Sequence, residues 1–261
     1  MIPHYNDAAR LEPFLSDLLK ILPERFKILV SDDGSRPEER DLLGRLVKKM
    51  QVAAVRTGGA KLLDPIFVEA NTGKGGAIGR GWKWAGTADI LAFTDADGAV
   101  CAKEILRVEE SFRSLESLGT DALFASRVKM LGRTVDRSLK RHLSGRFFAT
   151  LVSNLGGVPA YDTQCGLKFV KADAYKKIAP FLQSQGFAFD VELCLLLRKF
   201  GSSISEFPVD WRDVPGSKVS LIRDSWRMAL EVGRIVTRVG KLDTHFSKPQ
   251  SPQGTDGQID H

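Results

Sequence analysis

Apolar positions along this chain fall into two patterns that follow one another from its start to about residue 241. Short, mostly apolar runs are typical of strands that are covered on both faces. Longer stretches with apolar residues at three- and four-residue spacing are typical of helices with one buried side. Because strands and helices alternate, we predict an α/β fold with a mostly parallel sheet flanked by helices. The predicted strands cover residues 2–3, 26–30, 66–68, 90–93, 122–125, 167–170 and 204–208, and the predicted helices 11–21, 37–50, 77–85, 103–118, 172–181, 193–200 and 219–241.

The first predicted strand is unusually short, since Ile2 and Pro3 run almost at once into a loop. A sheet of this class normally begins with several apolar residues before such a proline. We therefore expect either a very short strand or, as the preferred interpretation, a first strand truncated because the true start lies upstream of Met1.

Composition narrows the class of protein without naming a partner. The chain has 261 residues, with 43% hydrophobic and 27% charged residues, which suits one large globular α/β domain or two small ones. A net charge of +6 is compatible with an anionic partner but does not identify one. Three dispersed cysteines and four histidines without metal-ligand spacing indicate reduced thiols in a cytosolic protein. No apolar run approaches the ~20 residues of a membrane span, and no nucleic-acid-binding motif accompanies the basic residues.

Two predicted strands end in pairs of carboxylates. Asp95 and Asp97 follow the strand at 90–93, and Asp32 and Asp33 follow the strand at 26–30. In open α/β sheets, ligands bind just beyond the carboxyl ends of the strands. Two carboxylates at such a place suit Mg²⁺, which usually keeps one or two protein carboxylates and adds substrate phosphates. The alternative is a turn that uses aspartate for local hydrogen bonds.

A glycine- and lysine-rich loop follows a third predicted strand. Gly73, Lys74 and Gly75 come directly before a predicted helix, so backbone N–H groups and one positive charge are available for an anion. A plain tight turn is the alternative interpretation. Because parallel strands end at the same edge of a sheet, we expect this loop and both carboxylate pairs to meet there.

Basic residues gather in two later segments. Between 127 and 146 the chain carries seven Lys or Arg and one acid, and Arg137, Lys140 and Arg141 share a helical turn. This segment is either a pocket for a second phosphate or a solvated basic face. The helix at 219–241 has basic residues on one side, which suits an anionic membrane surface or a docked helix with a solvated face. The residues of that basic side are Arg223, Arg227, Arg234, Arg238 and Lys241.

Together these motifs resemble the family 2 glycosyltransferases, which have the GT-A fold, a Rossmann-like fold that binds nucleotide sugars. The resemblance rests on Pro3-x-Tyr5-Asn6, Asp32-Asp33-Gly34-Ser35, Asn71-x-Gly73-Lys74-Gly75 and Asp95-Ala96-Asp97. The second half resembles the dolichyl-phosphate β-glucosyltransferase branch through Asp162-Thr163-Gln164-Cys165-Gly166-x-Lys168, Asp190-Val191-Glu192-Leu193 and Gly216-Ser217-Lys218. The resemblance as a whole covers about residues 2–240. The sequence given departs from the pattern in its short first strand and in the amino-terminal membrane anchor of the eukaryotic members. We expect these two departures to reflect either a true start upstream of Met1 or a soluble, peripheral relative.

The resemblance implies a role for each motif. It implies a catalytic domain at 1–218, an amphipathic basic helix at 219–245 and a tail at 246–261, whose polar composition predicts disorder. The residues implied to bind the nucleotide sugar are Pro3, Tyr5, Asp7 and Asp33 around the nucleoside, Gly73, Lys74 and Gly75 near the base and diphosphate, and Asp95 on the ribose or sugar side. Asp97 would bind Mg²⁺ or Mn²⁺. Phosphates would be held by Arg137, Arg141 and Lys218, while Asp190 or Glu192 would orient the acceptor unless they serve only the start of the helix at 193–200.

The activity implied is inverting transfer of a sugar, expected to be glucose, from a UDP-sugar to a polyprenyl phosphate. The protein would act peripherally on the cytoplasmic face of an anionic membrane and would not bind nucleic acid. Two alternatives remain: a family 2 transferase acting on a sugar or lipid hydroxyl, and a nucleotide-sugar-binding relative without turnover.

Overall fold

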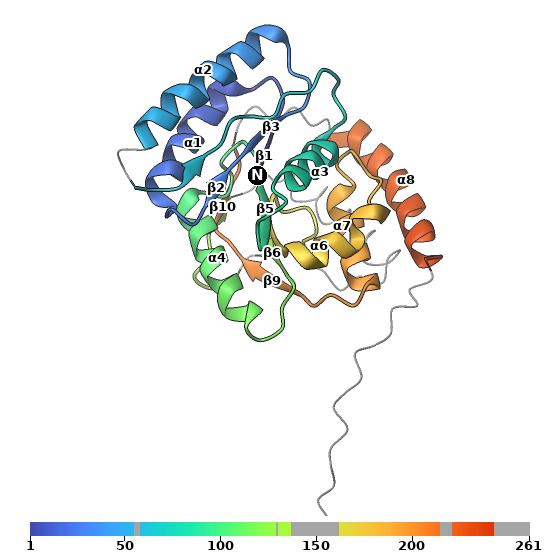
Figure 1. Ribbon diagram of the computed structural model, residues 1–261. Coiled ribbons are helices and arrows are strands. Elements are labelled where there is room, and N and C mark those ends of the chain that lie inside the picture. The colour runs from blue at the N-terminus through green and yellow to red at the C-terminus, as the bar shows by residue number, and fades with distance from the viewer. Residues whose placement is uncertain (55–57, 129, 137–161, 215–220, 243–261) are drawn as a thin grey trace, which may run out of the picture.

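The computed structural model describes residues 1–54, 58–128, 130–136, 162–214 and 221–242, with the backbone only for 221–227 (Figure 1). Strands and helices alternate along the chain, as the apolar pattern predicts. The strands are β1 (Ile2–His4), β2 (Lys27–Ile28), β3 (Val30–Asp32), β4 (Lys61–Leu62), β5 (Ile90–Thr94), β6 (Ala122–Ser126), β7 (Val135–Asp136), β8 (Leu167–Lys171), β9 (Ile204–Pro208) and β10 (Trp211–Arg212). The helices are α1 (Ala8–Ile21), α2 (Pro37–Ala54), α3 (Lys74–Trp84), α4 (Ala102–Glu116), α6 (Ala172–Ile178), α7 (Phe189–Lys199) and α8 (Leu221–Gly240), with a 3-10 turn, η1 (Ala179–Phe181).

The sheet is mostly parallel, with a reversal at β8. Strands β1 and β3, β2 and β4, β6 and β9, and β7 and β10 pair in parallel, while β8 lies antiparallel between β5 and β6. The Met1 amine donates to the Ala92 carbonyl at 2.9 Å, and the Thr94 N–H donates to the Met1 carbonyl at 3.0 Å. These two bonds have the parallel pattern and join β1 to β5, so the carboxyl ends of β1, β3 and β5 lie at one edge.

Helices cover both faces of the sheet. One face packs against α1, α2 and α4, and the other against α3, α6, α7 and α8 (Figure 1). Side chains alternate between the two faces along β8, since Leu167 and Phe169 belong to the first apolar core and Val170 to the second. Lys168 therefore belongs to the face that carries α3 and α7.

Several predicted elements differ from those observed. The strand predicted at 66–68 is a single bridge between Ser31 and Ile66, and the chain bends soon after it, at Glu69 and Ala70. The edge strand β4 forms earlier instead. Trp211 and Arg212, which lie outside every predicted element, form a short strand, β10, which pairs with β7. Helix α7 begins at Phe189, so both acids near its start lie inside its first turn.

The start of the chain is buried. Strand β1 has three residues, and burial lowers the pKa of the Met1 amine to about 5 because the charged form loses its water. A mostly apolar cavity of about 530 Å³ lies next to it, between β2 and β5, with Trp82 and Phe169 among its lining residues.

Helix α8 docks on the domain through its apolar side. Val232, Ile235 and Val239 are buried in the core that includes α7, whereas Arg234 and Lys241 are exposed. Val232, Ile235 and Val239 thus form the buried side of α8. The boundary predicted at 218/219 and the tail predicted at 246–261 lie outside the described residues. Within the described part of the chain, no helix combines the length and the apolar character needed to cross a bilayer.

Candidate active site

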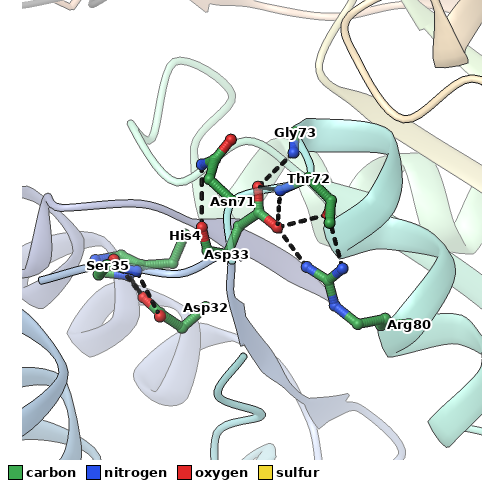
Figure 2. A network of polar contacts seen from close by, with 8 residues as sticks. All are labelled: His4, Asp32, Asp33, Ser35, Asn71, Thr72, Gly73 and Arg80. Carbon is green, nitrogen blue, oxygen red and sulfur yellow. Dashed lines mark hydrogen bonds and ion pairs between the residues drawn. The ribbon is translucent and has the colours of Figure 1, made fainter. Parts of the chain in front are cut away.

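The carboxylates that end β3 are both bonded by the protein itself (Figure 2). Asp32 accepts a bond from the Ser35 N–H at 3.0 Å, contacts the Ser35 hydroxyl at 2.5 Å and lies 2.9 Å from Nδ1 of His4. Burial alone would raise the pKa of Asp32, but these bonds with His4 and Ser35 lower it. Asp32 therefore ties the end of β1 to the turn after β3.

Asp33 organises the loop that leads into α3. Its carboxylate accepts bonds from the Thr72 N–H at 3.1 Å, the Gly73 N–H at 2.6 Å and the Arg80 guanidinium at 2.5 Å (Figure 2). The side-chain amide of Asn71 donates to the Asp33 carbonyl at 3.0 Å. The structure thus brings Asp33 and Gly73 together, as predicted. It also places the Asp33 oxygens in contact with four protein donors, so a nucleoside would have to share them.

The glycines of this loop are needed for close packing against another segment. Gly73 has a φ of +99°, and a Cβ there would lie 2.6 Å from the Gln185 carbonyl oxygen. A Cβ at Gly75 would lie 2.6 Å from the Ser184 carbonyl oxygen. The segment just before α7 therefore supports the loop, a reason for glycine that the sequence interpretation did not include.

The carboxylates that end β5 are less completely bonded. Asp95 forms an ion pair with Lys74 at 2.9 Å, and Asp97 accepts a bond from the Ala99 N–H at 3.0 Å. Within the described residues, Asp97 has no ion-pair partner. Burial and the negative charge of Asp95 raise the pKa of Asp97. Two neighbouring, incompletely bonded carboxylates thus form the anionic end of the site.

Asp95 also explains a glycine in the second half of the chain. A Cβ at Gly166 would lie 1.9 Å from Oδ2 of Asp95, and the Asp95 N–H donates to the Gly166 carbonyl at 2.9 Å. Only glycine lets β8 begin this close to the end of β5.

Asp190 lies deeper in the same site, between two lysines. Lys74 is 3.2 Å from its Oδ2, and Lys168 is 2.6 Å from its Oδ1. The N-cap residue of α7 is Ala188, so the capping role considered for Asp190 is wrong. Burial alone would lower the pKa of Lys74, but the charges of Asp190 and Asp95 raise it. Lys74 therefore stays positively charged between the two acids.

Glu192 does not face this cluster. Its buried carboxylate accepts bonds from the Gln183 and Ser184 N–H groups and pairs with Arg238 of α8. These contacts anchor the segment that supports Gly73 and Gly75, and they give no support to the predicted role of Glu192 in orienting the acceptor. Arg238 is partly exposed but paired with this buried acid, so it is not a free member of the predicted basic side.

The Asp-Thr-Gln-Cys-Gly motif lies just before β8 and is held in place by an ion pair. Arg127 donates two bonds to Asp162, at 2.7 and 2.6 Å, a bidentate pair that holds the start of the motif. Burial raises the pKa of the Cys165 thiol to about 12, so this cysteine stays protonated and is no nucleophile near neutral pH.

The remaining predicted residues divide into two groups. Pro3 pairs with Ser31 within the sheet, Tyr5 is exposed just beyond β1, and Asp7 pairs with Arg10 at 3.2 Å, all near the carboxyl end of β1. Their contact with a nucleoside stays a prediction. The predicted phosphate-binding residues Arg137, Arg141 and Lys218 lie outside the described residues.

The donor set at the end of β5 fits a hard divalent cation. Asp95 and Asp97 supply carboxylate oxygens, and the pKa of Asp97 is raised by burial and by the like charge of Asp95, both of which a cation would offset. Among the described residues no group of three or more His, Cys, Asp or Glu side chains could form a protein-only metal site. This set therefore suits Mg²⁺ or Mn²⁺ shared with a phosphate ligand.

Sequence reasoning gave no role to two residues of the site, Lys168 and Arg80. Lys168 is fully buried among the apolar residues of β8, and a lysine in the middle of a buried apolar run is a signal for a paired charge. No sequence signal links Arg80 to Asp33, because the pair forms only when α3 packs beside β3.

Comparisons with known proteins agree with this geometry. Residues 1–179 match the family described as Glycosyl transferase family 2. A dolichyl-phosphate beta-glucosyltransferase of Saccharomyces cerevisiae is 31% identical over 258 residues, which cover 93% of this chain and 74% of that protein. The Dictyostelium discoideum protein of the same name is 29% identical over 245 residues, covering 90% of this chain and 72% of that protein.

Solved structures support the fold. Glucosyl-3-phosphoglycerate synthase from Mycobacterium tuberculosis, in complex with Mn²⁺, UDP-glucose and glycerol 3-phosphate, matches with a TM-score of 0.58 and 15% identity, over 93% of this chain and 80% of that chain. A mannosyltransferase from Pyrobaculum calidifontis, in complex with GDP-Man and Mn²⁺, matches with a TM-score of 0.56 and 16% identity. The match covers 88% of this chain and 59% of that chain. The predicted GT-A fold is confirmed. This chain belongs to glycosyl transferase family 2 and is a glycosyltransferase similar to the dolichyl-phosphate beta-glucosyltransferases.

Proposed function

We propose that this glycosyltransferase transfers glucose from UDP-glucose to a polyprenyl phosphate, with inversion at the anomeric carbon. The names of its relatives suggest this donor sugar and this acceptor class. The observation that carries the proposal is that both oxygens of Asp190 face lysines, while Glu192 is bonded to a backbone segment and to Arg238. Neither of the two carboxylates proposed to orient the acceptor is therefore free to act as a general base.

An acceptor that is already ionised needs no such base. A phosphate oxygen of the lipid would form a bond to the anomeric carbon, while the bond from that carbon to the diphosphate breaks and UDP leaves with its electron pair. A hydroxyl acceptor would instead have to lose a proton during the reaction. The occupied carboxylates thus favour the lipid phosphate, with positioning and charge stabilisation supplying most of the rate.

The donor would lie across the edge formed by β1, β3 and β5. Asp97, with Asp95 beside it, would hold Mg²⁺ or Mn²⁺, which as a Lewis acid stabilises the departing diphosphate. Lys74 would face the same diphosphate, since its ammonium lies 2.9 Å from Asp95. Pro3, Tyr5, Asp7 and Asp33 would line the nucleoside side.

The acceptor chemistry also suggests where the protein acts. A polyprenyl phosphate resides in a membrane, and we propose that the chain binds peripherally to the anionic cytoplasmic face. Support comes from α8, which buries its apolar side on the domain and exposes Arg234, and from Lys241 just after it, which is also exposed.

An acceptor competition tests the proposal. The full chain would be given UDP-glucose and Mn²⁺, with undecaprenyl or dolichyl phosphate in one arm and dolichol or free sugars in the other. Product on the lipid phosphates, lost when EDTA is added, is the expected result. Turnover on hydroxyl acceptors alone would establish the alternative transferase, and UDP binding without turnover on any acceptor would establish a non-catalytic relative.

A further inference from the structure

Charged side chains of alternating sign lead from the interior of the domain to the site. Lys168 and Asp190 are 0% and 1% exposed, and they are followed by Lys74 at 12% and Asp95 at 40%. Successive pairs lie 2.6, 3.2 and 2.9 Å apart. The series connects β8, α7, α3 and the end of β5, and we call it the Lys168–Asp95 series.

Lys168 is the fixed end of this series. Its ammonium donates to Asp190 and, at 2.8 Å, to the Cys165 carbonyl, and it lies 5.2 and 5.0 Å from the ring centroids of Phe93 and Phe124. Burial of a lone charge costs several kcal/mol, so this cation is held in place by its partners. Lys168 cannot reach the cleft itself, because its side chain is fully buried.

Asp190 divides its negative charge between two cations. One oxygen faces Lys168 and the other faces Lys74, which also pairs with Asp95. If Lys168 were neutral, the whole charge of Asp190 would act on Lys74. Lys74 would then be drawn inward, away from Asp95 and from any anion that enters the site.

We propose that Lys168 is a positioning residue that keeps Lys74 available for the diphosphate of the donor by neutralising part of Asp190. The inference rests on the proposed function, in which a nucleotide diphosphate occupies this site. A purely structural alternative is that Lys168 only compensates a buried acid. The positioning role and the purely structural role predict different changes in UDP affinity for two substitutions.

The first test is Lys168→Met, which keeps the length of the side chain and removes its charge. We expect UDP to bind about tenfold more weakly, and uridine, which has no phosphate, to bind as it does to the wild type. The second is Asp190→Asn, which releases Lys74 and should tighten UDP binding severalfold. A general disturbance of the site would weaken binding in both variants, and that outcome would overturn the proposal.

The double variant Lys168→Met/Asp190→Asn should bind UDP about as tightly as Asp190→Asn alone, because Lys168 acts on Lys74 only through the charge of Asp190 and residues in contact are not additive. The matched control is Lys171→Met, on the same strand, whose lysine lies 3.5 Å from Asp121. It should leave UDP affinity unchanged. If Lys168→Met does not fold, the change in UDP affinity in Asp190→Asn still tests the proposal. Tighter UDP binding in that variant supports it, and weaker UDP binding overturns it.

Titration calorimetry with UDP, uridine and inorganic pyrophosphate, in EDTA and in Mn²⁺, supplies the measurements. If the wild type binds pyrophosphate but not UDP, the proposed function fails. The opposite changes in affinity expected for Lys168→Met and Asp190→Asn can then still be measured with pyrophosphate. If wild type binds UDP and the two single variants match it, the proposed function stands and the role of Lys168 is refuted. Binding of neither anion to wild type would overturn both.

Discussion

The strands β3 and β5 both end in a pair of carboxylates, but the protein treats the two pairs differently. Asp32 and Asp33 each accept several bonds from His4, Ser35, the 72–73 backbone and Arg80 (Figure 2). Asp97 has only the Ala99 N–H among the described residues. The number of donors that reach each carboxylate separates an acid whose oxygens are largely used within the fold from an acid with oxygens left for a cation.

The difference follows from what surrounds each strand end. The end of β3 lies beneath the loop before α3, whose backbone N–H groups point at Asp33. The end of β5 lies beside Gly166, just before β8, and a residue without a side chain leaves room for Asp95 instead of supplying a donor. The same sequence signature therefore gives a structural anchor at one strand and an open anionic site at the next.

The sharpest way to break this comparison is Asp97→Asn. We expect transferase activity to fall by at least about 100-fold and the metal-dependent part of UDP binding to be lost, because the carboxylate proposed to hold the cation is removed. The free energy of unfolding should not decrease at neutral pH, since Asp97 supports little of the fold and burial and Asp95 disfavour its charge. Radiolabelled transfer assays and chemical denaturation measure the two quantities. Wild-type turnover in this variant would refute the metal assignment.

The reverse pattern is expected for Asp32→Ala. This change leaves His4 and the Ser35 N–H without their buried acceptor, and we expect it to lower the free energy of unfolding by about 2–3 kcal/mol. Denaturant melts at neutral pH would measure the loss. At a temperature where the variant is folded, UDP affinity should remain within about threefold of wild type. Unchanged stability would show that Asp32 is not the anchor that its contacts indicate.

The alternation of strands and helices, and the meeting of three loops at one edge, could be predicted from the sequence because both follow from local patterns. Apolar runs identify β5, β6 and β8, and parallel strands necessarily end together. The outcome is that Asp33, Gly73 and Lys74 lie side by side and that Lys74 reaches Asp95, as the motifs predict.

The state of each carboxylate could not be predicted, because its partners come from distant parts of the chain. Arg80 pairs with Asp33 across 47 residues and Lys168 with Asp190 across 22. Arg238 reaches Glu192 only because α8 docks on α7. Local sequence shows an acid near a strand end or helix start, whereas tertiary packing decides how many donors that acid meets.

A smaller effect is expected from Gly166→Ala, which adds one methyl group beside Asp95. The new Cβ would lie 1.9 Å from Oδ2, so the carboxylate or the start of β8 must shift. We expect activity to fall about tenfold, because a shift of about 1 Å at a reacting site is costly. The control is Gly44→Ala in α2, where a Cβ would meet nothing within 4 Å. That variant should keep full activity and gain up to about 1 kcal/mol of stability.

The smallest effect, and the finest test of the comparison, is the titration of the two strand ends in metal-free protein. The pKa of Asp32 is lowered despite its burial by the bonds with His4 and Ser35, whereas burial and Asp95 raise the pKa of Asp97. With its lowered folded pKa, Asp32 contributes stability above its unfolded pKa of about 3.9 and loses it as the pH falls through the folded value. Asp97 has the opposite sign, because its folded state binds a proton more readily than the unfolded chain.

Carboxyl ¹³C NMR of the EDTA-treated chain would follow both groups, with Asp32→Asn and Asp97→Asn used to assign the signals. We expect the Asp97 signal to titrate at a higher pH than an ordinary aspartate and the Asp32 signal at a lower pH. The stability of Asp97→Asn relative to wild type should accordingly rise with pH across the titration of that group, because ionising the wild-type carboxyl costs more in the fold than in the unfolded chain. If both signals moved together, the two strand ends would have equivalent surroundings, and the distinction between anchor and ligand site would fail.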